Sequence, residues 1–120
     1  PLLPKPHIPD LETILQINDY VFIKENYKFQ KIQLNDILFF EADKNYTTIH
    51  TESRKIALRL TLNTVLERLS TTKFIRVHRS YAVNIDKIDS FDEHDLNIGK
   101  FQIPIGRSHK EDFMKYFLFR

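Results

Sequence analysis

The sequence predicts a mostly β fold with short flanking α-helices, and three observations predict it. Between residues 20 and 105, most apolar residues lie in short runs rich in β-branched and aromatic side chains, which favour strands. Apolar residues at helical spacing occur in two stretches, one in the middle and one at the end of the chain. Asparagine and aspartate recur between the runs and suit tight turns in a chain with two glycines.

The first half of this body contains most of the expected strands. The run 37–40 is apolar throughout, which indicates a strand buried on both faces. The expected strands cover residues 20–23, 29–34, 37–40, 46–51 and 55–60, and shorter ones follow at 88–91, 96–98 and 101–105.

Two helices are expected beside these strands. The first carries Leu62, Val65, Leu66 and Leu69 on one face, with Thr61 as its N-cap. For the second, Ser108 and Glu111 match a capping box, Ser at the cap and Glu three residues on. This second helix is expected to turn four apolar residues inward, namely Phe113, Met114, Phe117 and Leu118.

Length and composition indicate a single globular domain. The chain has 120 residues, of which 42% are hydrophobic and 28% charged. It contains no cysteine, which excludes disulfides and thiolate metal sites, and no apolar run near the roughly 20 residues that span a bilayer. These features predict a cytoplasmic protein that does not enter a membrane. Residues 1–18 are expected to be a linker or N-terminal arm, because four of the five prolines lie in residues 1–10, and residues 19–120 to be the folded domain.

The charges are unevenly distributed, although the formal net charge is only +2. Residues 53–85 hold seven basic residues and one acid, residues 86–95 hold five acids and one base, and residues 96–110 are basic again. Such a pattern can present one face to a polyanion, or it can be ordinary scatter over a solvated surface. Charge alone leaves both interpretations open.

Catalysis is not expected. None of the five histidines has the i, i+4 helical spacing with a carboxylate that metal hydrolases use. Two glycines cannot build a phosphate-cradling loop. The sequence therefore predicts a protein that is not an enzyme, with no cofactor and no metal site.

Three short segments are candidates for nucleic-acid binding. In the first, His78, Arg79 and Ser80 stand between apolar anchors and can donate to phosphates or base edges. The alternative is structural: Arg76 and Arg79 would pair with the acids at 86 and 89, and His78 would cap a turn. The residues alone leave both open.

The other two segments are also turns. Arg107, Ser108 and Lys110 flank the start of the predicted final helix, which favours an anion site, although Ser108 is equally a plain helix cap. Asn45 and Tyr46 follow a predicted turn and would contact nucleic acid if that turn faces the other two segments.

A series of motifs, in order along residues 19–118, resembles the LytTR DNA-binding domains of the LytR/AlgR/AgrA family of bacterial response regulators. The most specific is the string FIRVHRSYAVN at 74–84. The others are DILFFEA at 36–42, NY at 45–46, TL at 61–62, Ile88, and IPIGRS at 103–108.

The resemblance implies a fold and a function. It implies an elongated stack of small antiparallel sheets with helices at its sides. It also implies sequence-specific binding of double-stranded DNA by loops that enter successive major grooves, at paired or repeated sites and with a possible homodimer on the DNA. The domain would regulate transcription as the output domain of a two-component response regulator, behind an upstream receiver domain that is missing here.

The reading loops of the family fall on the three segments already chosen. They give Asn45 and Tyr46, then His78, Arg79 and Ser80, then Arg107 with Ser108 and Lys110. Among these, Arg79 and Arg107 would read base edges, and His78, Ser80 and Lys110 would make phosphate or mixed contacts. The chain departs from the family pattern at Gly106, where a small polar or Val-Ser type residue is expected before the arginine.

Two other functions remain in competition. An RNA-binding β domain would stack single strands on exposed aromatic side chains. It is disfavoured by the expectation that Phe39, Phe40, Phe74, Phe113 and Phe117 pack in the core. A protein-interaction module would pair through an exposed strand edge and would not depend on Arg79 or Arg107.

Overall fold

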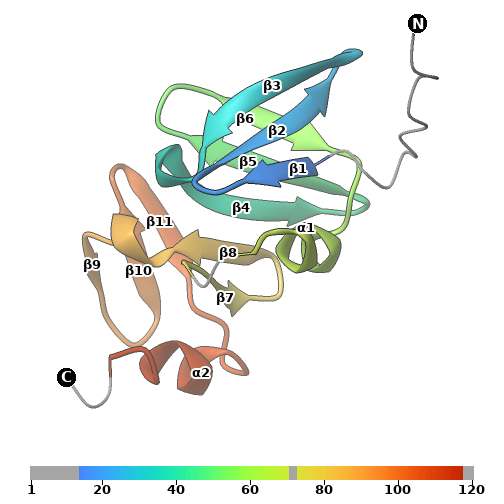
Figure 1. Ribbon diagram of the computed structural model, residues 1–120. Helices are drawn as coiled ribbons and strands as arrows, with labels where there is room; N and C mark the ends of the chain where they lie inside the picture. The colour runs from blue at the N-terminus through green and yellow to red at the C-terminus, as the bar shows by residue number, and fades with distance from the viewer. Residues whose placement is uncertain (1–13, 71–72, 118–120) are drawn as a thin grey trace, which may run out of the picture.

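The fold consists of three antiparallel sheets and two short helices in the part of the chain that the computed structural model describes, residues 14–70 and 73–117 (Figure 1). Sheet A has the order β1-β2-β3, and its strands are β1 (Ile14–Ile17), β2 (Tyr20–Glu25) and β3 (Lys28–Gln33). Sheet C has the order β11-β10-β9, and its strands are β9 (Ser90–Phe91), β10 (Asp95–Ile98) and β11 (Phe101–Pro104).

Sheet B lies between the other two and has the order β6-β5-β4-β8-β7. Its strands are β4 (Ile37–Asp43), β5 (Tyr46–Thr51), β6 (Lys55–Leu58), β7 (Phe74–His78) and β8 (Tyr81–Asn84). The remaining elements are α1 (Leu62–Arg68), α2 (Lys110–Met114) and the 3-10 turns η1 (Leu34–Asp36) and η2 (Ile85–Lys87).

The two faces of sheet B pack on two separate cores. Successive residues of a strand point to opposite faces, so Phe40 enters the core formed with sheet A and α1, while Phe39 enters the core formed with sheet C and α2. Strand β4 is therefore buried on both faces, as its apolar run predicts. The stack measures 58 × 31 × 25 Å, and the expected elongated, mostly β architecture is confirmed.

Helix α1 follows its sequence pattern closely. The Thr64 backbone N–H donates to Oγ1 of Thr61, at 3.2 Å, which confirms the predicted N-cap. Leu62, Val65 and Leu69 are buried against sheets A and B. The helix thus closes the first core beside β4 and β5.

The prediction for the final helix was wrong at its start. Helix α2 begins at Lys110 with His109 at the N-cap and no side-chain cap, so the capping box of Ser108 and Glu111 does not form. Instead, the His109 N–H bonds the carbonyl of Gly106, which makes a turn before the helix, and Ser108 Oγ lies 3.2 Å from His109 Nδ1. Phe113 is buried as predicted, whereas Met114 is 37% exposed; Leu118 lies outside the described residues.

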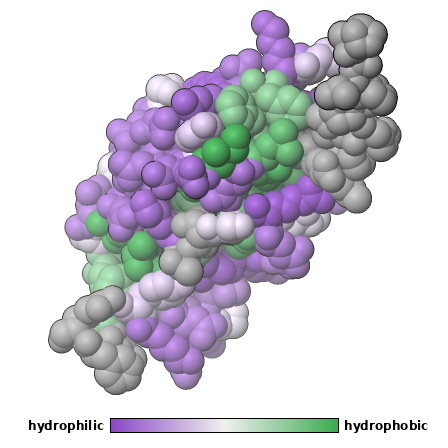
Figure 2. Space-filling model, viewed as in Figure 1, coloured by the Kyte–Doolittle hydropathy of each residue, from purple (hydrophilic) through white to green (hydrophobic). Residues whose placement is uncertain are grey.

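The N-terminal segment also adds an element. Residues 14–17, part of the arm expected at 1–18, form β1 and pair with β2, while residues 1–13 lie outside the described part. Leu15 and Ile17 on this strand are exposed, and apolar side chains gather over sheet A on the face in view (Figure 2). No helix in the described ranges is long and apolar enough to span a membrane.

Candidate nucleic-acid interface

Two of the three predicted segments are turns that meet at one edge of sheet B, the edge formed by the ends of its strands. Strand β4 ends where Asp43 pairs with Tyr46 at the β4–β5 turn, and its residue Glu41 pairs with Tyr81 beside the β7–β8 turn. The Ala42 N–H donates to the Ser80 carbonyl at 2.8 Å. The two turns are therefore neighbours because β4 lies between β5 and β8.

The third segment, residues 105–110 between β11 and α2, joins the same edge. The Gly106 N–H donates to the Val77 carbonyl at 2.7 Å, so this segment is hydrogen-bonded to β7. A Cβ at Gly106 would lie 3.4 Å from Cα and Cδ2 of His78 and 3.5 Å from Nδ1 of His109. The third segment thus lies directly against the second at Gly106, and a methyl group there would make ordinary van der Waals contacts.

We call these three segments, residues 43–46, 78–81 and 105–110, the loop edge. In Figure 1 the β4–β5 and β7–β8 turns lie at the right-hand ends of their strands, and the third segment leads into α2 below them. Within it, the guanidinium groups of Arg79 and Arg107 are exposed and have no hydrogen-bond or ion-pair partner in the described part of the chain. Asn45, Tyr46 and Ser108 are exposed, and His78, Ser80 and Lys110 are half-buried. All eight residues predicted from the sequence thus lie on one edge.

The structural alternative for the arginines is wrong. Asp86 pairs with Lys73, at 3.6 Å, and the Asp89 carboxylate accepts from the Gly99 N–H, at 2.7 Å. Neither carboxylate binds Arg76 or Arg79. The charge of Arg79 is therefore available at the loop edge.

His78 supports the β7–β8 turn from inside. Its Nδ1 accepts a hydrogen bond from the Ser80 N–H at 3.0 Å, and its ring centroid lies 5.6 Å from that of Tyr81. Burial lowers the pKa of His78 below its ordinary value, and the nearby charges of Arg79, His109 and Arg76 lower it further. A neutral ring that accepts at Nδ1 carries its proton on Nε2, which leaves that N–H as the donor.

A second polar contact to the β7–β8 turn comes from Glu41 on β4. Glu41 accepts from the Tyr81 hydroxyl through Oε2, at 3.4 Å, and contacts Nε2 of His50 through Oε1, at 2.9 Å. Burial and the Glu41 carboxylate together raise the pKa of Tyr81, so its hydroxyl stays protonated. These contacts connect the β7–β8 turn to the centre of sheet B.

Sequence reasoning missed several residues at this edge. Arg59 is exposed and directly follows Leu58, which pairs with Thr47 beside the β4–β5 turn. The register between β5 and β6 is therefore the signal that could have placed Arg59 at the loop edge. Glu93 is also at this edge, because its carboxylate lies 3.8 Å from Nζ of Lys110. Because Glu93 and Lys110 are far apart along the chain, no local sequence pattern indicates this ion pair.

The match to a protein-family model decides what kind of domain this is. Residues 27–118 match the model described as the LytTr DNA-binding domain. The chain belongs to the LytTr DNA-binding domain family.

Curated relatives agree with this assignment. The Escherichia coli K12 transcriptional regulatory protein YpdB is 24% identical over 111 residues, covering 84% of this chain and 44% of YpdB. The heme-containing CO-sensing transcriptional regulator RcoM 2 of Paraburkholderia xenovorans is 34% identical over 84 residues, covering 64% of this chain and 32% of RcoM 2. The chain thus spans less than half the length of these relatives.

The fold is shared with a solved LytTr domain. That domain comes from a putative methyl-accepting/DNA response regulator of Bacillus cereus; it superposes with a TM-score of 0.71 at 21% identity, over 85% of this chain and 99% of the other. The expected family and fold are both confirmed.

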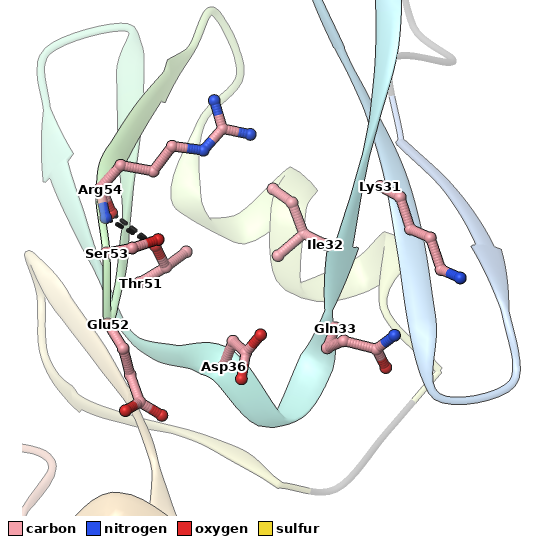
Figure 3. A pocket seen from close by; sticks show the side chains of 8 residues that line it. All are labelled: Lys31, Ile32, Gln33, Asp36, Thr51, Glu52, Ser53 and Arg54. Atoms are coloured by element: carbon pink, nitrogen blue, oxygen red, sulfur yellow. Dashed lines mark hydrogen bonds between the residues drawn. The ribbon is translucent and has the colours of Figure 1, made fainter.

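The opposite edge of this LytTr domain carries a groove of about 410 Å³ between β3 and the β5–β6 turn (Figure 3). Its charged lining residues carry both signs, namely Lys31, Asp36, Glu52 and Arg54. The groove lies far from the loop edge, because Thr51 pairs with Ile37 at one end of the β4–β5 pair, whereas Tyr46 pairs with Asp43 at the other end. Among the described residues, no group of histidine, aspartate and glutamate side chains could hold a metal ion.

Proposed function

We propose that this LytTr domain binds double-stranded DNA in a sequence-specific manner, with the loop edge inserted into major grooves. One observation carries the proposal: three segments far apart in the sequence share one edge, where Arg79 and Arg107 extend into solvent without a carboxylate partner in the described chain. The backbone hydrogen bonds from Gly106 to Val77 and from Ala42 to Ser80 hold these segments together. A fixed spacing of side chains is what sequence reading requires.

The side chains have distinct roles in this proposal. The guanidinium groups of Arg79 and Arg107 each match the two acceptors on the major-groove edge of guanine. The Nε2–H of His78, the Ser80 hydroxyl and the Lys110 ammonium supply phosphate or mixed contacts. Asn45, Tyr46 and Ser108 contact the flanks of the site.

The biological setting is part of the same proposal. The domain acts as the output domain of a two-component response regulator, with a receiver domain elsewhere in the polypeptide, and it controls transcription in the cytoplasm. It binds paired or repeated sites, on which two copies form a homodimer. It catalyses no reaction and needs no cofactor.

Fluorescence anisotropy with three labelled probes tests this proposal. A random-sequence duplex, a duplex enriched by selection on this domain, and a single-stranded RNA are titrated with the domain over a salt series. We expect tight binding to the selected duplex, weaker and steeply salt-dependent binding to the random duplex, and little binding to RNA. Preference for the RNA would favour the RNA-binding alternative, and the absence of duplex binding at low salt would favour a protein partner.

A further inference from the structure

The β7–β8 turn is irregular, and its irregularity leaves backbone groups without strand partners. Arg76 pairs with Ala82 and His78 pairs with Tyr81, so Val77 is an extra residue in β7. A bulge of this kind interrupts the ladder of backbone hydrogen bonds. The carbonyl groups around the turn therefore need donors from elsewhere.

Each of the four carbonyls from Val77 to Ser80 has such a donor. The backbone N–H groups of Gly106 and Ala42 bond those of Val77 and Ser80, at 2.7 and 2.8 Å. The other two depend on one side chain: Arg76 donates through Nε to the His78 carbonyl, at 2.9 Å, and through Nη2 to the Arg79 carbonyl. Half of the turn's carbonyl bonds thus come from the Arg76 guanidinium.

The third branch of this guanidinium reaches outside the hairpin. Nη1 of Arg76 donates to Oδ1 of Asn63 in the first turn of α1. No carboxylate pairs with Arg76 in the described residues, and the side chain is half-buried, which lowers its pKa without removing its charge at neutral pH. Its planar fork serves three acceptors in three directions, which a lysine ammonium on a flexible stem does not reproduce.

We propose that Arg76 is the positioning residue of the β7–β8 reading turn, and that Asn63 anchors it to α1. By holding the His78 and Arg79 carbonyls, Arg76 fixes the backbone from which the side chains of His78 and Arg79 extend. The turn is thereby ordered before DNA arrives, which lowers the entropic cost of binding. Arg76 itself does not contact DNA. The inference rests on the proposed function.

The test compares Arg76→Lys, which keeps the charge, with Asn63→Ala and with Arg54→Lys, a matched control at an exposed arginine on the opposite edge of sheet B. Dissociation constants are measured for the selected duplex and a scrambled duplex at several salt concentrations. We expect Arg76→Lys to reduce the preference for the selected duplex by about tenfold, without changing the salt slope or the scrambled-duplex affinity. Asn63→Ala should reduce the preference less, and Arg54→Lys should leave it at the parent value.

Hydrogen exchange of the turn amides is followed by NMR in the same variants, without DNA. Faster exchange at the Ser80 amide in Arg76→Lys is expected, because its acceptor on His78 moves with the backbone. Parent preference together with parent exchange in Arg76→Lys would overturn the inference. So would an equal loss on both duplexes with a lower salt slope, which would indicate a direct phosphate contact.

The same measurements also distinguish a failure of the proposed function from a failure of the Arg76→Lys variant to fold. If the parent binds no duplex, the proposed function fails while the Ser80 exchange still tests the role of Arg76 in the turn. If Arg76→Lys does not fold, Asn63→Ala decides, since Asn63 is exposed and its loss leaves the core intact; an unchanged preference and exchange rate there would overturn the inference.

Discussion

At the scale of single residues, the eight loop-edge side chains divide into those that face solvent and those that build the turns. Arg79 and Arg107 are exposed and free to contact a ligand, whereas His78 is half-buried and accepts from Ser80. The sequence offered two roles for His78, a DNA contact and a cap of the turn, and the hydrogen bond from the Ser80 N–H matches the second. Residue type alone could not reveal this bond, because it depends on the orientation of the ring.

The half-buried position of His78 beside other cationic groups predicts a pH dependence of stability. Its pKa is lowered by burial and by neighbouring cations, so below its ordinary value near 6.5 the unfolded chain binds more protons than the folded one. The free energy of unfolding should therefore fall as the pH drops from about 6.5 towards the folded pKa of His78. Urea unfolding at pH 7 and pH 5.5 checks this, with His78→Asn as control because Asn keeps an acceptor. An equal pH effect in both proteins would contradict the assignment.

Lys44 has a strained backbone conformation and an exposed positive charge within the loop edge. It adopts φ 59° in the β4–β5 turn, a conformation that costs a side chain roughly 1 kcal/mol relative to glycine. Lys44→Gly should raise the free energy of unfolding by up to about 1 kcal/mol while weakening duplex binding at low salt. Denaturation and anisotropy on the same sample measure both; a gain in DNA affinity would show that Lys44 does not face DNA.

At the scale of elements, β7 and α2 show what sequence patterns capture. The string at 74–84 predicted four buried anchors, of which Phe74, Val77 and Val83 are buried and Tyr81 is only half-buried. The capping box failed because the Gly106–His109 turn intervenes before α2, and this turn depends on a long-range bond from Gly106 to Val77. Local patterns predict burial and element type well, whereas contacts between distant segments set where short helices begin.

Phe74 anchors β7 in the first core. It is 8% exposed, and its ring lies 4.9 Å from that of Phe40 in an edge-to-face arrangement. Phe74→Ala should cost about 3–5 kcal/mol of stability, and DNA binding should be lost as a consequence. Phe91→Ala, at a ring that is 39% exposed, is the matched control and should cost clearly less. Equal losses would show that the β7 core is not the main support.

Glu93 introduces an opposing charge next to the third loop. Its carboxylate lies 3.8 Å from Nζ of Lys110 and is largely exposed. Glu93→Gln should release Lys110 and remove a charge that repels phosphate, strengthening binding to all duplexes alike by up to a few-fold. Asp112→Asn, which removes the partner of Lys115 on α2, is a matched control. Weaker binding of Glu93→Gln would mean that Glu93 takes part in recognition.

At the scale of the whole molecule, the three-layer stack explains how one edge becomes a reading surface. Sheet B supplies two turns through the adjacency of β5, β4 and β8, and sheet C supplies the third by returning the chain along β11 to β7. The family motifs predicted this fold and this set of loops. The sequence alone could not predict the Arg76 bonds, the ion pair of Glu93 or the pairing of β1 with β2, because each joins residues whose proximity arises only on folding.

The most direct test of the account is duplex binding by Arg79→Ala/Arg107→Ala, measured by anisotropy on the selected and scrambled duplexes. The matched control is Arg54→Ala/Lys55→Ala, which removes two exposed cations at the opposite edge of sheet B. We predict that the loop-edge variant stays folded but loses preference for the selected duplex, by about 1–3 kcal/mol for each arginine, while the control binds like the parent. A loop-edge variant that keeps its preference, or a control that loses as much, would contradict DNA reading by this edge.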